Sequence, residues 1–568
     1  MRFRFALTQD RAGDGETKMS ATTWWQRATG YQVYPRSFCD ANGDGVGDIP
    51  GLISKLDHLA DLGIGFIWLS PVYASPMADN GYDISDYEAI APEFGTMADM
   101  ERLIAEAKAR GIGIVMDLVV NHTSDEHAWF KSARGSLVDA KRDYYVWRDP
   151  DSDGGPPDET QSLFGGPAWT LDPVTGQYYL HLFDRKQPDL NWENPALRAE
   201  IWAMMNRWFD RGTAGFRMDV IDLIGKDIDA GIIADGPRLH EYIREMHRET
   251  LRGRDVVTVG EAWSARPDNA LLYTGRDRGE LSMVFQFSHV VEGWDAEFGK
   301  WRARPRDLVA LKRVFNAWQA ALADDGWNSL FWSNHDLPRA VSKYGDDSAE
   351  WRVRSAKALA TVLHLMKGTP YVYQGEEIGM TNMAFSRVEE FDDVEIRNNY
   401  PVQTGRGLSE DEFLAGANAN GRDNARTPMQ WEAGEGAGFT VGTPWLPINP
   451  NYRAINVAAD RSDPEGVFAH YKSLISLRNR LDIISQGRFV PLAEDHPAVW
   501  AYARELAGER LTMVANLTSA PVGFDLPPEG TVAGRCIAAT AGPRDGLEGR
   551  IELAPWEAVA VLGSVRPT

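Results

Sequence analysis

The stretch IGIVMDLVV, residues 112–120, is a nearly continuous apolar run of strand length. Such a run is typical of a strand that is buried on both faces, as in a parallel sheet covered by helices. Its acid, Asp117, lies toward the end of the run, and Asn121 and His122 follow directly. The stretch therefore predicts a buried strand with polar groups at its carboxyl end.

Seven further runs have the same character and alternate with segments of helical periodicity, of which 97–111 and 194–212 are the clearest. The runs are 31–35, 64–70, 214–220, 255–263, 281–287, 329–334 and 370–377. Eight buried strands that alternate with helices predict a parallel (β/α)8 barrel of the TIM type.

Two long intervals interrupt the alternation, and both follow strand ends, where barrels place their active sites. Residues 122–190 predict an inserted subdomain, and 376–455 predict a long irregular loop after the eighth strand. Short alternating runs beyond 485 predict a C-terminal antiparallel β domain over 486–568. The barrel then takes 21–121 and 191–485. We interpret 1–20 as a disordered tail, with Met1 and Met19 as alternative starts.

The composition excludes several classes of partner. The 568 residues carry a formal net charge of −23, which argues against nucleic acid and anionic membranes. No apolar run approaches the roughly 20 residues that a membrane span needs. The two cysteines, Cys39 and Cys536, form no disulfide framework, as is typical of a reducing compartment. A neutral molecule such as a sugar is indifferent to this charge. We expect a cytoplasmic monomer or homodimer.

Four strand ends carry groups that are able to do chemistry. They hold Asp117, Asn121 and His122; Arg217 and Asp219; Glu261; and Asn334, His335 and Asp336. A lone acid at a strand end is usually a helix cap or a solvated loop residue. Four such ends on one rim of a barrel predict an active site.

The physical chemistry of these residues suggests a division of labour. Arg217 and Asp219 share one face of a strand, and a guanidinium keeps a nearby carboxylate ionised, as a nucleophile requires. Glu261 follows an apolar strand, and apolar surroundings favour the protonated form that a general acid needs. Two acids of this kind perform glycoside hydrolysis. We expect Asp336 to bind sugar hydroxyls.

The segments DLVVNH (117–122), GFRMDV (215–220), GEAW (260–263) and FWSNHD (331–336) resemble, in order and spacing, four signature segments of the α-amylase superfamily of glycoside hydrolases. QPDLN (187–191) resembles the fifth segment in its oligo-1,6-glucosidase form. The resemblance implies a retaining, exo-acting α-glucosidase that hydrolyses terminal non-reducing α-glucosyl residues of short oligosaccharides without an organic cofactor.

The resemblance also implies roles for single residues. Asp219 matches the nucleophile, Glu261 the acid/base and Asp336 the transition-state stabiliser. The positions that match the glucose pocket are Asp79, Tyr82, His122, Phe164, Phe183, Gln187, Arg217, Val220, His335 and Arg422. A pair formed by Asp79 and Arg422 would close one end of the site. Because a blind pocket admits only a chain end, this pair predicts exo action; the alternative is an ordinary surface salt bridge.

The loop DANGDGVGD, residues 40–48, places oxygen ligands at alternate positions around glycines. Hard cations prefer such ligands, and the loop resembles the calcium loop at the first βα turn of oligo-1,6-glucosidase-like enzymes. The expected ligands of a structural Ca²⁺ or Mg²⁺ are Asp40, Asn42, Asp44, Asp48 and the carbonyl group of Val46. The alternative is an Asx-rich turn without metal.

Val220 directly follows the expected nucleophile, and in related α-glucosidases Val at this position accompanies α-1,6 activity. We therefore expect a preference for isomaltose and isomaltooligosaccharides, with activity on α-1,4, α-1,3 or sucrose linkages and transglycosylation beside it. The alternatives are an α-1,4-preferring maltase and a sucrose isomerase or transglucosylase. The stretch RVEEFDDVEIRNNY (387–400) lacks the arginine-rich loop of sucrose isomerases. A catalytically dead sugar-binding barrel would not need all three acids.

Overall fold

A closed parallel barrel forms the centre of the protein in the computed structural model, which describes residues 23–564. The expected tail, 1–20, lies outside the described residues. The barrel strands are β1 Gly30–Val33, β2 Phe66–Leu69, β5 Gly113–Val119, β9 Gly215–Asp219, β10 Val257–Glu261, β11 Met283–Phe285, β12 Ser329–Leu330 and β13 Thr369–Tyr373. Their order is β11-β10-β9-β5-β2-β1-β13-β12, and a parallel bridge from Val284 to Asn328 joins the two edges. Each predicted run overlaps one strand, and the TIM-barrel fold class is confirmed.

The register of neighbouring strands sets the site. In the parallel pair of β5 and β9, Asp117 is the partner of Arg217, and Val119 is the partner of Asp219. Gly215 begins β9 where a Cβ atom would lie 1.8 Å from the carbonyl oxygen of Val257 on β10. Only glycine therefore fits this close approach, which keeps β9 between its neighbours.

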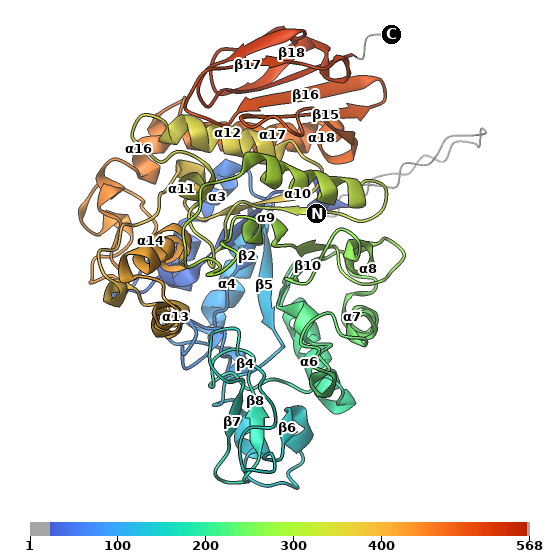
Figure 1. The fold of residues 1–568 in the computed structure, drawn as a ribbon, viewed down its shortest axis with the longest axis vertical. Coiled ribbons are helices and arrows are strands. Elements are labelled where there is room, and N and C mark those ends of the chain that lie inside the picture. Colours follow the sequence, from blue (N-terminus) through green and yellow to red (C-terminus); the bar gives the residue numbers. More distant parts are fainter. Residues whose placement is uncertain (1–22, 565–568) are drawn as a thin grey trace, which may run out of the picture.

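Helices surround the barrel (Figure 1). The main ones are α3 Leu56–Leu62, α4 Met97–Ala109, α6 Pro195–Asp210, α7 Leu239–Met246, α8 Ala270–Thr274, α10 Leu308–Ala321, α12 Arg352–His364 and α17 Val467–Arg480. Helix α4 begins with a capping box of Thr96 and Asp99, and the chain leaves it at Gly111, where φ is +77°. Both ends therefore follow from local sequence signals.

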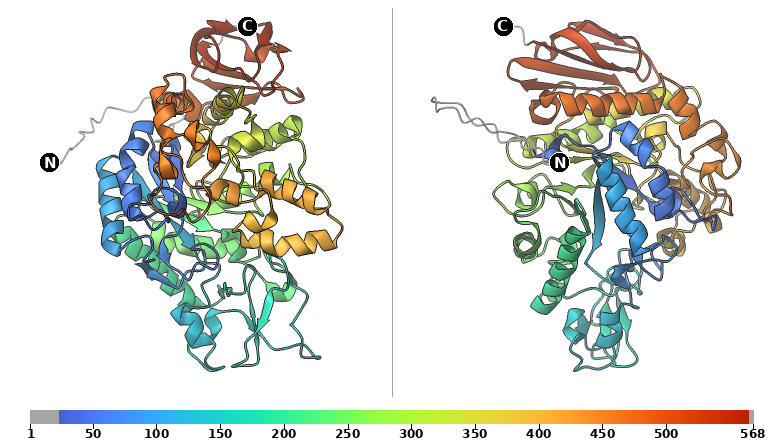
Figure 2. Two further views of the ribbon diagram at one scale, coloured as in Figure 1. Left: turned by 90° about the vertical axis from the view of Figure 1, so that its left-hand side faces the viewer. Right: turned by 180° about the vertical axis from the view of Figure 1, so that it is seen from behind.

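The insertion after β5 holds a small antiparallel sheet in the order β6-β8-β7, formed by Trp147–Arg148, Tyr178–Leu180 and Trp169–Leu171. It lies at one end of the molecule, and the C-terminal domain lies at the other (Figures 1 and 2). The stretch after β13 differs from the expected irregular loop, because it contains α13 Val394–Gly405, α14 Glu410–Asn420 and the short α15 Asp423–Arg426. These helices form where Asp393 caps α13 and a capping box of Ser409 and Glu412 begins α14.

The C-terminal domain is an antiparallel sheet in the order β14-β15-β16-β21-β18-β19, with β17 and β20 as a second pair. The strands are β14 Arg488–Pro491, β15 Val499–Leu506, β16 Glu509–Asn516, β17 Val522–Asp525, β18 Val532–Ala539, β19 Gly546–Leu547, β20 Arg550–Leu553 and β21 Ala558–Ser564. It packs on α12 and α17, away from the insertion (Figure 2).

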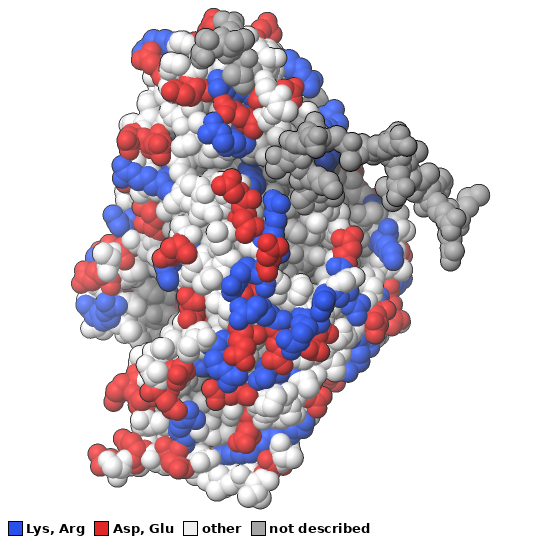
Figure 3. Space-filling model, turned by 90° about the vertical axis from the view of Figure 1, so that its right-hand side faces the viewer, with Lys and Arg blue, Asp and Glu red and all other residues white. Residues whose placement is uncertain are grey.

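The surface carries both signs of charge in spite of the acidic composition. Acidic and basic side chains are interspersed on the face that Figure 3 shows. No helix among the described residues is long and apolar enough to cross a membrane. Both cysteines are free thiols.

Candidate active site

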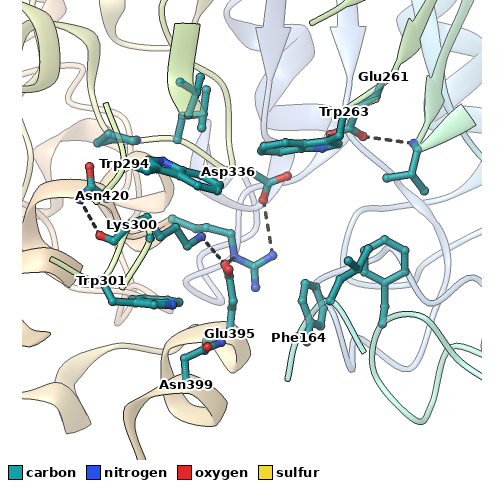
Figure 4. Close-up of a pocket in the computed structure, with 18 of the residues that line it drawn as sticks. Phe164, Glu261, Trp263, Trp294, Lys300, Trp301, Asp336, Glu395, Asn399 and Asn420 are labelled. Atoms are coloured by element: carbon teal, nitrogen blue, oxygen red, sulfur yellow. Dashed lines mark hydrogen bonds and ion pairs between the residues drawn. The ribbon is translucent and has the colours of Figure 1, made fainter. Parts of the chain in front are cut away.

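A cavity of about 580 Å³ opens at the carboxyl ends of the barrel strands (Figure 4). Its volume lies within the range of roughly 300–1,000 Å³ that is typical of small-molecule sites. The predicted residues that line it are Asp79, Tyr82, His122, Phe164, Phe183, Asp219, Val220, Glu261, Asp336 and Arg422. The other three, Gln187, Arg217 and His335, lie directly behind this lining and contact it.

Arg217 lies at the centre of a buried cluster of acids. Its Nη1 donates to Asp117 at 2.8 Å and to Asp219 at 2.7 Å, and its Nη2 donates to Glu261. Burial raises the pKa of Asp219, and the contact with Arg217 opposes that shift. The expected pairing of Arg217 with Asp219 is present, but three carboxyl groups share this one guanidinium.

The surroundings of Glu261 differ from the apolar environment that the sequence suggests. Besides Arg217, its carboxyl group accepts a hydrogen bond from the N–H of Val220 at 3.2 Å and from Nε1 of Trp263 at 3.1 Å. These donors come from β9, from the turn directly after it and from the segment that follows β10. The apolar run that ends in Glu261 does not predict them. The three contacts fix the orientation of the carboxyl group at the wall of the cavity.

Asp336 also lines the cavity and lies between two arginines. Its Oδ1 accepts from Nη2 of Arg426 at 2.7 Å, and Nη1 of Arg422 lies 3.5 Å away. Burial acts to raise the pKa of Asp336, but the positive charges around it outweigh burial and lower the pKa. Asp336 is therefore an ionised carboxylate. Sequence reasoning missed Arg426, although it lies only four residues after Arg422.

One end of the cavity is closed by charged side chains. Nη1 of Arg422 lies 3.8 Å from Asp79, so the expected contact is present but long. The closer partner of Arg422 is Asp393, which accepts from its Nε at 3.0 Å. Burial raises the pKa of Asp79 to about 7, against the opposing effect of Arg422. The sequence interpretation missed Asp393, which carries a helix-cap signal but nothing that points to Arg422.

Aromatic and amide groups form the floor of the closed end. The ring of Tyr82 stacks on His335 with a centroid distance of 5.3 Å and an interplanar angle of 6°. Gln187 donates to Asp79 at 3.2 Å, and Nε2 of His122 lies 3.1 Å from the carbonyl oxygen of Tyr82. Burial lowers the pKa of His122 to about 4 and that of His335 to about 3, so both imidazoles are neutral.

The open side carries residues that the sequence analysis did not assign. Trp263 is 41% exposed and stacks on Phe287 at 3.9 Å. Across from it, Nζ of Lys300 lies 2.6 Å from Glu395, and both side chains point into the cavity (Figure 4). Trp263 follows the end of β10, but Lys300 and Glu395 come from two other loops and follow no strand-end pattern, so only the tertiary structure brings the three together.

The backbone at Val220 is strained. Its φ of 35° and ψ of 47° lie in the left-handed region, which a β-branched residue rarely adopts. This conformation follows directly after Asp219 and turns the N–H of Val220 toward Glu261. The N–H group of Val220 thereby links the nucleophile, Asp219, to the acid/base, Glu261: it follows the first in the chain and donates a hydrogen bond to the second.

The loop at 40–48 closes on its own hydrogen bonds. Asp40 accepts from the amides of Asn42 and Gly43, at 3.0 and 2.7 Å, and Asp44 accepts from the amide of Val46 at 2.8 Å. Among the described residues, no group of three or more His, Cys, Asp or Glu side chains is arranged to hold a metal ion. The divalent ion therefore stays a prediction, and the fully hydrogen-bonded Asx turn is the geometry observed.

Known proteins share this architecture and sequence. The family model of the α-amylase catalytic domain matches residues 32–487. A palatinase of Erwinia rhapontici is 55% identical over 96% of this chain and 99% of its own length. An oligo-1,6-glucosidase of Halalkalibacterium halodurans is 49% identical over 96% of this chain and 99% of its own.

A solved structure agrees with these sequence matches. The trehalulose synthase MutB of Pseudomonas mesoacidophila superposes with a TM-score of 0.91 at 43% identity, over 96% of this chain and all of its own. The barrel, the buried acids at its strand ends and these matches lead to one assignment. The chain belongs to the α-amylase family and is a glycoside hydrolase of the α-glucosidase type.

Proposed function

We propose that the enzyme is an exo-acting, retaining α-glucosidase that prefers α-1,6 linkages in short oligosaccharides. The observation that carries this proposal is a cavity closed at one end by Asp79 and Arg422, with Asp219 and Glu261 beside it on one shared guanidinium. A pocket that is closed at one end accepts the end of a chain and not its middle, which favours exo action.

The spacing of the acids favours retention. Retaining enzymes hold their two carboxyl groups about 5–5.5 Å apart, and inverting enzymes need about 6.5–9.5 Å to admit a water between them. Asp219 and Glu261 both contact the guanidinium of Arg217, so they flank a single planar group. Contact with one guanidinium brings the two carboxyl groups near each other, and the proposal predicts a separation of about 5–5.5 Å between them.

The chemistry then follows in two displacements. Glu261 gives its proton to the glycosidic oxygen while Asp219 attacks the anomeric carbon, which leaves a covalent glucosyl-enzyme and a free leaving sugar. Glu261 then takes a proton from a water molecule, which attacks the same carbon and releases glucose with its original configuration. Asp336, ionised beside Arg426, is placed to bind hydroxyl groups of the distorted ring.

Two observations support the α-1,6 preference. Val220 lines the cavity directly after the nucleophile, and relatives at about half identity bear the name oligo-1,6-glucosidase. A sucrose isomerase is the rival, because a trehalulose synthase has the same fold. At the rim, however, residues 387–400 contribute Asp393 and Glu395 to the ion pairs of Arg422 and Lys300, where isomerases carry an arginine-rich loop.

A hydrolysis panel of isomaltose, maltose, nigerose, sucrose and trehalose tests the proposal. We expect the highest kcat/KM for isomaltose, with α-glucose as the first product by NMR. We expect Asp219→Asn to lower kcat about 10⁴-fold or more with an unchanged thermal midpoint, since it removes the nucleophile. A preference for maltose, or conversion of sucrose mainly to an isomer, would overturn the substrate assignment.

A further inference from the structure

Helix α13 presents a row of polar side chains to the cavity. Glu395, Asn399, Gln403 and Arg406 all line it, and their spacings of four, four and three residues place them on one face of the helix. At a rise of 1.5 Å per residue the row covers about 16 Å of helix. This length exceeds that of a single pyranose ring.

The row is linked by its own hydrogen bonds. Asn399 donates to the carbonyl oxygen of Glu395 at 3.0 Å, Gln403 donates to Asn399 at 3.3 Å, and Arg406 donates to Gln403 at 2.8 Å. Each contact fixes the rotamer of a side chain, and the amides of Asn399 and Gln403 each keep a second N–H and a second oxygen lone pair with which to bind a ligand. A row of oriented amides suits a ligand with many hydroxyl groups.

The row begins at the glucose pocket and leads away from it. Glu395 lies 3.5 Å from Arg422, which closes the blind end, and Asn399 lies next to the insertion, 4.0 Å from the position of a Cβ atom at Gly165. Because the blind end takes the terminal glucose, every further sugar unit has to leave through the open side. The polar face of α13 borders this exit (Figure 4).

The wall next to α13 is aromatic and held in place. It is the loop after α9 (Ser288–Val291), which contributes Phe298 and Trp301, and the guanidinium of Arg406 lies 5.3 Å from the ring of Phe298. A Cβ atom on Gly416 of α14 would lie 1.9 Å from the carbonyl oxygen of Trp301, so the loop packs directly on the helix backbone. A pre-formed wall lowers the entropic cost of binding a flexible chain.

The charge of the exit favours a neutral ligand. Lys300 is paired with Glu395 at 2.6 Å, so these two charges balance each other. Between this ion pair and Arg406, the row consists of the uncharged amides of Asn399 and Gln403. Arg406 directs one guanidinium nitrogen to Gln403 and the other to the carbonyl oxygen of Glu297 at 2.8 Å. For the phosphate of a phosphorylated leaving sugar, α13 offers only the guanidinium of Arg406, which already donates two hydrogen bonds within the protein. A neutral glucan chain finds a row of hydrogen-bonding groups.

We propose that Asn399, Gln403 and Arg406 form a binding track for the second and later sugar units of the leaving group, so that the enzyme prefers oligosaccharides of three or more glucosyl units to disaccharides. This inference rests on the proposed exo-glucosidase function. It assigns the ligand class, a neutral gluco-oligosaccharide chain, to a surface outside the glucose pocket.

The test compares kcat/KM for isomaltose, isomaltotriose and isomaltotetraose. We expect the wild-type value to rise with chain length. In Asn399→Ala and Gln403→Ala, we expect the ratio of isomaltotetraose to isomaltose to fall about 5- to 10-fold, the effect of losing one hydrogen bond to a bound chain. Asn398→Ala is the matched control, because Asn398 is the neighbouring residue of the same type, is exposed and does not line the cavity.

Three results would overturn the track: no rise with chain length in the wild type, an equal loss for all substrates in the variants, or the same loss in Asn398→Ala. A wild-type preference for a phosphorylated disaccharide that Arg406→Ala removes would also overturn it. The same series with maltooligosaccharides separates the track from the proposed linkage. Chain-length dependence there, without activity on isomaltose, would contradict the linkage and support the track.

Discussion

At the scale of single residues, we expect the shape of the Val220 side chain to set the preference for α-1,6 over α-1,4 linkages. It lines the cavity beside the nucleophile and packs in an apolar cluster with Leu223 and Phe183. We expect Val220→Thr to lower the ratio of kcat/KM for isomaltose over maltose by roughly tenfold, since pocket shape differences of this size contribute about 1–3 kcal/mol. The same exchange at the exposed Val291 should leave the ratio unchanged. An unaltered ratio in Val220→Thr would remove Val220 from the specificity argument.

Asp79 predicts a pH dependence. Its pKa is raised to about 7 by burial, and ionisation turns both oxygens into charged acceptors for sugar hydroxyls, whereas the protonated form has an O–H donor on one of them. We therefore expect kcat/KM, which reports the free enzyme, to fall as the pH drops through about 7. The shift also affects folding. Between about pH 4 and pH 7, Asp79 is protonated in the native protein but ionised in the unfolded chain, so the stability of the fold decreases as the pH rises through this range.

The matching control is Asp79→Asn, which cannot titrate at this position. The acidic limb near pH 7 should be absent from the residual activity of this variant. If the limb persists, the titrating group is another acid of the site, and Asp219, whose pKa is also raised by burial, would be the first to test.

At the scale of elements, one residue begins a helix and also holds the pocket closed. Asp393 accepts from the N–H of Glu395 at 2.9 Å as the N-cap of α13, and it is the closest carboxylate to Arg422. We expect Asp393→Asn, which keeps the capping oxygen but removes the charge, to raise KM for isomaltose about tenfold. Asp393→Ala should lose about 1 kcal/mol more stability through the cap.

The cap of the next helix separates these two effects. Ser409 is the N-cap of α14 and does not line the cavity, whereas Asn420 at the other end of this helix does. Ser409→Ala should therefore lower the free energy of unfolding by about 1 kcal/mol without changing KM. Equal changes of KM in Ser409→Ala and Asp393→Asn would show that α13 and α14 act through stability and not through Arg422.

The same elements show what a sequence can predict. The barrel strands were predictable because a strand buried on both faces needs a continuous apolar run, and the acids of the site follow such runs directly. Helices α13 and α14 were missed, although Asp393 and the Ser409 box are local signals, because their core is a separate cluster around Phe413 with weak periodicity. The pair of Lys300 and Glu395 was not predictable, since 95 residues separate two side chains that only the fold brings together.

At the scale of the whole molecule, the barrel is attached to the C-terminal domain on the side away from the insertion and the site (Figure 2). Lys312 of α10 donates to the carbonyl oxygens of His496 and Val499, at 2.7 and 2.8 Å. Burial lowers the pKa of this ammonium group to about 8. The contact therefore joins two domains through a desolvated charge, and the residues that touch substrate do not take part in it.

The loop at 40–48 acts on the same scale, because it connects segments far apart in the chain. Asp40 accepts from the hydroxyl group of Thr440 at 2.5 Å, and the N–H of Trp445 donates to the carbonyl oxygen of Gly45 at 3.1 Å. The loop after β1 is thereby hydrogen-bonded to residues 440–445, at the end of the long segment that follows β13. A divalent ion in this loop would stabilise the contact by about 2.7 kcal/mol at 100 times its dissociation constant.

We therefore expect EDTA to lower the thermal midpoint by several degrees, at roughly 2–4 °C per kcal/mol, and added Ca²⁺ or Mg²⁺ to restore it. Asp44→Asn keeps the hydrogen bond to the amide of Val46 but loses a charged ligand, so its midpoint should be lower and should not respond to EDTA. A wild-type midpoint that is the same with and without EDTA would mean that hydrogen bonds alone hold the loop. Activity at a temperature well below the midpoint should be unaffected by EDTA, because the carboxylates of the site need no metal for the two displacements.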